Sequence, residues 1–397
     1  MRATTIGMPD AHAAPGLDRV TTILLFAFVA AVQLSIAAAQ IFLGGLLLCW
    51  IVGMVRDKTR PAAPAFFAAL LAYAGITLIS SVFAMAPLES FIDDRQLLLF
   101  VIVPLVYDLA RGHRAAMLTD VVITVGAAAA AYGIVQYGML HFDSLGQRPH
   151  GTLGHYMTYS GTLMLVIGVA GARLVFSSRD RAWPALVMPA LVVALSLTLT
   201  RSAWVGACVA VGVLFILKDL RLLGLLPVLV ALFFALAPDS VTDRMVSMFD
   251  LRDPTNRDRL AMARTGMAMV RDFPLTGVGP EMIPKLYVQY RDPDAVQAMN
   301  PHLHNVPLQI AAERGLPALG IWLTFIAVLT YGLFRLFRTE RDPALAAAGL
   351  AAVAGMLSAG LFEYNFGDSE FLMLFLVLVT LPFAAARRDD AAATPRA

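Results

Sequence analysis

Residues 316–336 read LPALGIWLTFIAVLTYGLFRL, a run with a single charged residue, Arg335. A helix of about 20 mostly apolar residues is long enough to cross the hydrocarbon core of a bilayer. The rest of the chain has the same character, because 59% of its 397 residues are hydrophobic and only 15% are charged. A water-soluble domain cannot hide so much apolar surface. The composition therefore predicts an all-α integral membrane protein.

About twelve apolar segments, this one included, are expected to serve as transmembrane helices. They are residues 20–38, 39–55, 64–84, 96–110, 117–140, 154–176, 182–199, 203–217, 221–237, 316–336, 343–363 and 368–386. One large and partly helical loop separates the ninth helix from the tenth. The predicted organisation is an N-terminal tail, nine helices, the loop, three helices and a C-terminal tail. Their bounds are 1–19, 20–237, 238–315, 316–386 and 387–397.

The distribution of Lys and Arg predicts the topology of these helices. If the N-terminus lies inside, each link expected in the cytoplasm carries at least two basic residues. These are Arg56, Lys58 and Arg60; Arg111 and Arg114; Arg179 and Arg181; Lys218 and Arg221; and Arg335, Arg338 and Arg341. The short links on the other side carry at most one each, namely Arg95, Arg148 and Arg201. Because short cytoplasmic loops collect Lys and Arg, we expect both termini in the cytoplasm and the large loop outside. The basic residues follow the membrane topology, so no nucleic-acid partner is expected.

The large loop contains a predicted helix, residues 256–272, whose arginines divide between two faces. Arg257, Arg264 and Arg271 recur every seven residues and predict one solvated stripe. Arg259 lies on the opposite, apolar face, which is expected to pack onto the membrane domain. An arginine on an apolar face needs a partner or an anionic ligand. Arg259 is therefore the functional candidate of this helix.

Arg201 is a second candidate, because it stands at the outer end of the seventh apolar segment with almost no loop to carry it into water. A charge held at a membrane boundary is often functional. The alternative is an anchor at the membrane surface, paired there with Trp204.

His302-Leu303-His304-Asn305 stands close before residues 316–336. A neutral imidazole in this position can accept a proton from a hydroxyl near pH 7. Two alternatives stay open, a hydrogen-bonded surface histidine and a metal site. The remaining outer histidines that would complete such a metal site are His141, His150 and His155. No HExxH pattern accompanies them.

Two further polar stretches border the outer ends of apolar segments. Residues 148–160 read RPHGTLGHYMTYS and begin with Arg148, which predicts a water-filled cavity that opens outward. Glu363 and Asp368 stand beside aromatic residues, where they either orient an arginine or a sugar hydroxyl or are ordinary solvated loop residues. The GVG sequence at 277–279 is expected to form a turn rather than a phosphate cradle.

Four of these stretches together resemble the bacterial O-antigen ligase and polymerase family of integral membrane glycosyltransferases. They are Thr200-Arg201-Ser202; Arg259 with DFPLTGVG at 272–279; His304-Asn305 with Leu308-Gln309 and Glu313-Arg314-Gly315; and FEYNFGD at 362–368. The resemblance runs from about residue 60 to 380. The ligase signature places Gly-x-x-Gly nine residues after His-Asn. Gly315 matches its first glycine, whereas Ala318 stands at the second position with Gly320 nearby.

The resemblance implies a GT-C type enzyme that transfers a glycan from undecaprenyl diphosphate to an acceptor hydroxyl, on the periplasmic side of the bacterial inner membrane. Transfer would proceed with inversion and without a metal or cofactor. Arg201 and Arg259 would hold the diphosphate, and His304 would position or deprotonate the hydroxyl. The further candidates for diphosphate or glycan contacts are Arg148, His155, His302, Asn305, Glu363 and Asp368.

The preferred function is an O-antigen ligase with lipid A-core as acceptor, in lipopolysaccharide biosynthesis. An O-antigen polymerase or a protein O-oligosaccharyltransferase would share the machinery and differ in the acceptor. A twelve-helix transporter is the alternative from a different class, but its substrate charges should lie near the middle of the membrane.

Overall fold

The computed structural model describes residues 15–177 and 181–387, which contain helices and no strands. Each predicted apolar segment coincides with helical structure. The helices are α1 (Pro15–Ala31), α2 (Ile36–Asp57), α3 (Phe66–Val82), η1 (Asp94–Val101) with α5 (Ile102–Leu109), α6 (His113–Met139), α7 (Tyr156–Phe176), α8 (Ala182–Leu197), α9 (Arg201–Lys218), α10 (Leu225–Leu236), α14 (Val306–Thr339), α15 (Ala344–Ala359) and α16 (Ser369–Ala386). The predicted tails, 1–19 and 387–397, lie largely outside the described residues, as does Arg179.

The described part of the chain contains six helices that are long and apolar enough to cross a membrane, namely α2, α6, α7, α9, α14 and α16. Shorter apolar helices are Phe66–Val82, Ala182–Leu197, Leu220–Phe233 and Ala344–Ala359. The chain is thus an all-helical, multi-pass membrane protein. The count of twelve spans and the topology stay predictions.

Small residues let the central helices approach closely. The Ala-rich helix α15 packs against both α7 and α9. A Cβ atom added at Gly206 of α9 would lie 3.0 Å from the carbonyl oxygen of Gly355 in α15, and one at Gly168 of α7 would lie 3.4 Å from the Cβ of Ala351. Close approach of this kind is a common basis for helix association in membranes. The small residues of α15 thus form helix contacts on two sides.

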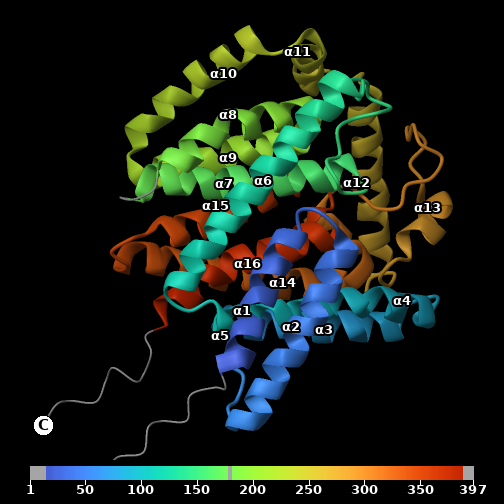
Figure 1. The fold of residues 1–397 in the computed structure, drawn as a ribbon. Helices are drawn as coiled ribbons and strands as arrows, with labels where there is room; N and C mark the ends of the chain where they lie inside the picture. Colours follow the sequence, from blue (N-terminus) through green and yellow to red (C-terminus); the bar gives the residue numbers. More distant parts are fainter. Residues whose placement is uncertain (1–14, 178–180, 388–397) are drawn as a thin grey trace, which may run out of the picture.

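The large loop gathers at one end of the bundle, together with the short helix α4 (Pro87–Asp93). Figure 1 shows α4, α12 (Pro254–Asp272) and α13 (Ile283–Tyr290) at this end, on the right of the view, away from the end at which α16 leaves. The remaining loop elements are α11 (Asp239–Val246) and η3 (Ser247–Phe249). Lys285 of α13 forms an ion pair with Glu89 of α4, so two loops that are predicted on the outer side meet here.

The residues predicted on the inner side meet one another in the same way. Arg387 lies 2.5 Å from Asp108, and Arg114 lies 3.0 Å from Asp18. The loops that are predicted outside thus contact one another, and the segments that are predicted inside contact one another.

Helix α14 begins at Val306, ten residues before the predicted start of the tenth helix, and breaks at Gly315, where φ is 82°. The chain around Gly277 crosses this break. Val278 N donates to Ala312 O over 2.8 Å, and a Cβ atom at Gly277 would lie 2.2 Å from the carbonyl carbon of Glu313. Gly277 has a φ of 68°, which glycine adopts without strain. The glycines at 277–279 thus dock the loop on α14, as expected for a turn.

Candidate active site

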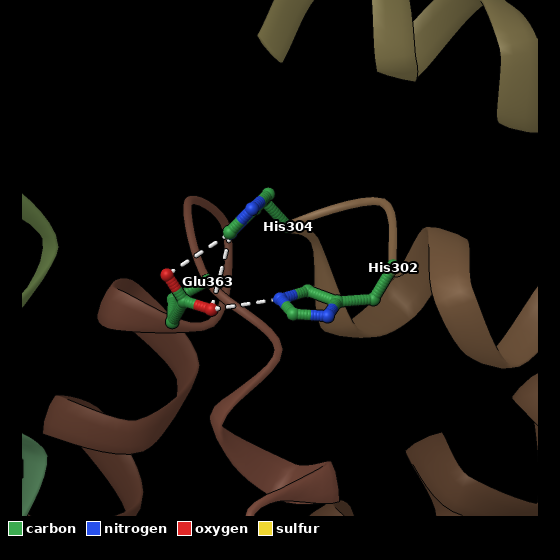
Figure 2. Close-up of side chains that lie close together, drawn as sticks. All are labelled: His302, His304 and Glu363. Atoms are coloured by element: carbon green, nitrogen blue, oxygen red, sulfur yellow. Dashed lines mark hydrogen bonds and ion pairs between the residues drawn. The ribbon is translucent and has the colours of Figure 1, made fainter. Parts of the chain in front are cut away.

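Glu363 joins the two histidines of the loop. Figure 2 shows His302 and His304 both directed at its carboxylate. Nδ1 of His304 lies 3.0 Å and 3.1 Å from the two carboxylate oxygens, and Nε2 of His302 lies 3.4 Å from the nearer one. The histidines come from the segment before α14, whereas Glu363 comes from the turn between α15 and α16. Val306 N donates to Gly360 O over 2.7 Å and holds these two segments together.

The position of Asn305 explains how His304 is presented. The Asn305 side chain caps α14 by accepting a hydrogen bond from Leu308 N over 2.9 Å, and its amide donates to Leu361 O over 3.1 Å. His304, the residue before the cap, adopts a left-handed φ of 49°. Backbone strain of this kind is found at functional sites. Asn305 therefore positions His304, and it lines neither of the two cavities that flank the histidines.

Glu363 is negatively charged over the whole neutral range. Burial opposes its ionisation, but the hydrogen bonds from His302 and His304 outweigh burial and hold the pKa of Glu363 well below its usual range. A carboxylate on Nδ1 fixes the imidazole tautomer and leaves Nε2 free to accept a proton. His304 and Glu363 thus form a carboxylate–imidazole pair suited to general base chemistry.

A basic cavity of about 330 Å³ opens beside His304. Its wall carries four arginines, Arg148, Arg201, Arg244 and Arg259. Burial, with repulsion from Arg201 and Arg148, lowers the pKa of Arg244 to about 10. So many guanidinium groups around one hollow create a strong site for a multivalent anion such as a diphosphate.

Arg201 and Arg259, the two predicted arginines, are held in different ways. Arg201 is 5% exposed, and it donates to Ser247 O over 3.0 Å and to Asp253 over 3.1 Å. Asp253 is also the N-cap of α12, so one carboxylate fixes both the helix and the arginine. Arg259 is half-buried and makes no hydrogen bond or ion pair with any residue that the structure describes. Its donors are free for a ligand.

The helix α12 confirms the predicted division of arginines between two faces. Arg257, Arg264 and Arg271 are exposed, and Arg264 pairs with Asp294 over 2.8 Å. The buried face carries Ala261, Met262, Thr265, Gly266 and Met269. Trp204 donates to Leu195 O over 3.0 Å inside the bundle and does not pair with Arg201. Arg201 therefore lines the basic cavity and is not an anchor paired with Trp204 at the membrane surface.

An acidic cavity of about 270 Å³ lies on the other side of the histidine pair. His302 and His155 line it together with five carboxylates, Asp93, Glu281, Glu313, Glu363 and Asp368. Met157 lines both cavities, so the basic and the acidic cavity meet along a wall made by the start of α7 and by the histidine segment. The polar entrance predicted for residues 148–160 is confirmed as a lining of both.

The remaining candidates combine structural roles with places on the cavity walls. Arg148 lies in the basic cavity with its guanidinium carbon 4.2 Å from the centre of the Tyr156 ring. His155 caps α7 by accepting a hydrogen bond from Met157 N over 3.3 Å. Asp368 caps α16 by accepting one from Phe371 N over 2.9 Å, and it also accepts from the Thr158 hydroxyl.

A metal site is the alternative interpretation of the histidines, and three residues of the described chain could form one. Across residues 15–177 and 181–387, one group of His, Cys, Asp and Glu side chains is close enough to share an ion, and it consists of His302, His304 and Glu363. His141, His150 and His155 do not belong to this group, so the alternative in which they complete a metal site is wrong. His150, for example, has its Nδ1 2.8 Å from Leu153 O.

Residues 185–323 match the family model described as O-antigen ligase. This stretch of the chain is therefore similar to the O-antigen ligase family, which supports a membrane protein of the O-antigen ligase and polymerase family. The match confirms the resemblance inferred from the motifs, and it covers Arg201, Arg259 and His304 but ends before Glu363. The family comprises membrane glycosyltransferase-like enzymes, which supports a transferase in general. No curated protein matches the chain.

Several residues of the site were not predicted from the sequence. Arg244 lies in the short helix α11, and no motif distinguishes it from the other charges of the loop. Asp93 and Glu281 come from separate loops that meet only in the folded chain. Glu313 belongs to the family motif, but its place in the sequence predicts no chemical role for it.

Proposed function

We propose that the chain is an O-antigen ligase, which transfers a glycan from undecaprenyl diphosphate to a hydroxyl group of lipid A-core. The reaction would take place on the periplasmic side of the inner membrane, with both chain termini in the cytoplasm. One observation carries this proposal, namely that a cavity with four arginines adjoins the His304–Glu363 pair.

The donor fits the basic cavity. As the bond between the anomeric carbon and the diphosphate breaks, the leaving diphosphate gains negative charge. Arg201 and Arg259 would stabilise that charge, in the role that a metal ion has in other enzymes. Arg201 is already fixed by Asp253, whereas the unpaired donors of Arg259 supply new hydrogen bonds. The proposed reaction therefore needs no metal and no cofactor.

His304 would act on the acceptor. Its Nε2 takes the proton of the acceptor hydroxyl while the hydroxyl oxygen forms a bond to the anomeric carbon. Glu363 holds the imidazole and stabilises the imidazolium that results. Because the oxygen attacks from the side opposite the diphosphate, a single displacement inverts the anomeric centre.

An apolar groove supports a donor that is linked to a lipid. This groove has a volume of about 180 Å³, lies between α8, α9 and α10, and is lined by residues such as Leu195, Phe233 and Met245. Arg244, the neighbour of Met245 in the chain, lines the basic cavity. A polyprenyl tail in the groove would therefore bring its diphosphate directly to the arginines.

A reconstituted assay tests the proposal and its alternatives. The purified chain in lipid bilayers is given a glycan on undecaprenyl diphosphate, together with lipid A-core, a lipid-linked repeat unit or pilin as acceptor. We expect the glycan on lipid A-core, and we expect Arg259→Ala to reduce transfer by about 10²–10³-fold. Elongation of the lipid-linked repeat would instead identify a polymerase, and glycosylated pilin a protein O-oligosaccharyltransferase. Passage of the intact donor across the bilayer without transfer would identify a transporter and overturn the proposal.

A further inference from the structure

The acidic cavity has a polarity opposite to that of the donor cavity, although both adjoin the same pair of histidines. None of the arginines that line the basic cavity lines the acidic one. The buried Arg314 is already paired, at 2.6 Å from Glu313 and 3.8 Å from Asp93. The acidic side chains that a ligand meets in this cavity include the ionised Glu363.

Buried amide groups in the same wall indicate that the cavity is made for a ligand. Gln309 is 1% exposed and lines the cavity. Its Oε1 accepts a hydrogen bond from Leu303 N over 2.7 Å, whereas its amide nitrogen has no partner among the described residues. Asn365, 7% exposed, donates to Met356 O over 3.1 Å and leaves its Oδ1 without a partner in the described chain. A buried polar group without a partner is costly unless a ligand or water satisfies it.

A sugar hydroxyl satisfies such a wall, because it donates one hydrogen bond and accepts others. It can donate to a carboxylate such as that of Asp93 or Glu281 and accept from the amide of Gln309. A phosphate or carboxylate on the ligand can only accept, and it would face like charges in a partly desolvated space.

We propose that the acidic cavity binds the acceptor of the transfer reaction and selects an acceptor sugar without phosphate or carboxylate groups. A neutral sugar is accepted, and a protonated amino sugar is favoured. This inference rests on the proposed function and names the chemical class of its acceptor. The acceptor hydroxyl enters from the His302 side and reaches Nε2 of His304 where the two cavities meet, at Met157. For lipid A-core, the sugar that enters would be an unphosphorylated one, with the core phosphates left outside.

The experiment compares three acceptors of equal size in the reconstituted chain: a hexose glycoside, its amino-sugar analogue and its sugar phosphate. Both transfer and direct binding are measured, the latter by saturation-transfer NMR without a donor. We expect kcat/KM to fall by about tenfold or more from the hexose to the sugar phosphate, because like charges in a shielded cavity repel strongly. The amino sugar should be used at least as well as the hexose.

Two variants change the cavity charge without touching the histidine pair. Glu281 is exposed at the cavity wall, and Asp93 lies on α4 with a side chain that is 33% exposed. We expect Glu281→Gln, and more strongly Glu281→Gln with Asp93→Asn, to reduce the discrimination against the sugar phosphate. Asp294→Asn is the matched control, because Asp294 is 66% exposed and pairs with Arg264 outside the cavity. It should leave the ratio unchanged.

The outcomes separate this inference from the proposed function. Equal use of the three acceptors, or a preference for the sugar phosphate, would overturn the inference and leave the transfer reaction intact. Charge-selective binding that disappears in Glu281→Gln, without transfer to any acceptor, would support the cavity assignment and overturn the proposed function. Discrimination that is unchanged in the double variant would show that these carboxylates are not its source.

Discussion

The basic and the acidic cavity differ in how their charges are held. In the basic cavity, Arg201 is fixed by a carboxylate while Arg259 is left without a partner. In the acidic cavity, Asp368 accepts hydrogen bonds from a backbone N–H and a hydroxyl, whereas Glu363 is bonded by imidazoles. The first arrangement leaves positive charge for a ligand, and the second leaves negative charge. In the proposed reaction, the donor would approach from the basic cavity and the acceptor from the acidic one.

The two histidines and Glu363 lie between the two cavities. His304 faces the basic cavity and His302 the acidic one, and both bind Glu363. The positive field of the basic cavity stabilises negative charge that develops on the donor side. A variant can therefore change the basic cavity, the acidic cavity or the histidines between them.

The largest effect is expected for His304→Ala, which removes the proton acceptor from the wall. A general base contributes about 10²–10⁴-fold to the rate, so transfer should fall by that order. His302→Ala should cost less, because Glu363 still orients His304. The measurement is the initial rate of glycan transfer in the reconstituted system, with His141→Ala as the control. Full activity of His304→Ala would remove the proposed mechanism.

The next largest effect is expected for Arg259→Ala in the basic cavity. Loss of one preorganised donor at developing charge costs about 10²–10³-fold in kcat. The variant should fold normally, because Arg259 has no protein partner to lose among the described residues. Arg257→Ala is the matched control, since Arg257 is exposed on the same helix. Similar rates for both variants would mean that the cavity does not bind the leaving diphosphate.

A smaller effect on stability is expected for Glu363→Gln. The folded state lowers the pKa of Glu363, so its hydrogen bonds stabilise the fold at every pH above the pKa of an unfolded glutamate, about 4.3. Loss of hydrogen bonds to a charged group costs about 1.5–3 kcal/mol. Thermal melts should therefore show a constant deficit from pH 5 to 8, and the deficit should shrink as the pH falls below about 4. Glu340→Gln, at an exposed position, is the control. A deficit that grows in acid would contradict the pKa direction.

The smallest effect is expected for metal removal. His302, His304 and Glu363 are close enough to bind an ion, but the proposed reaction uses them for hydrogen bonding and proton transfer. Treatment with EDTA should leave the transfer rate unchanged, and added Zn²⁺ should inhibit by occupying the imidazoles. Inhibition by EDTA that one particular metal reverses would favour the metal alternative.

Much of the fold was predictable, because its signals are local. Apolar runs correspond to the helices, and the spacing of Arg257, Arg264 and Arg271 marked the exposed side of α12. Helix α14 begins at Val306, before the predicted boundary at residue 315, but its helical conformation breaks at Gly315. Arg201 was predictable for a similar reason, because a charge at the end of an apolar segment is visible in the neighbouring residues.

The sequence by itself determined that this protein is helical, lies in a membrane and carries the residue types of a glycosyltransferase, because composition, spacing and family motifs are properties of neighbouring residues. Only the tertiary structure decided that Glu363 meets His304 across 59 positions of the chain, that Arg244 joins the basic cavity and that five carboxylates from separate segments form the acidic one. These contacts depend on how the large loop docks on α14 and on the turn after α15. That docking is a balance of long-range packing and backbone hydrogen bonds, which no local pattern encodes.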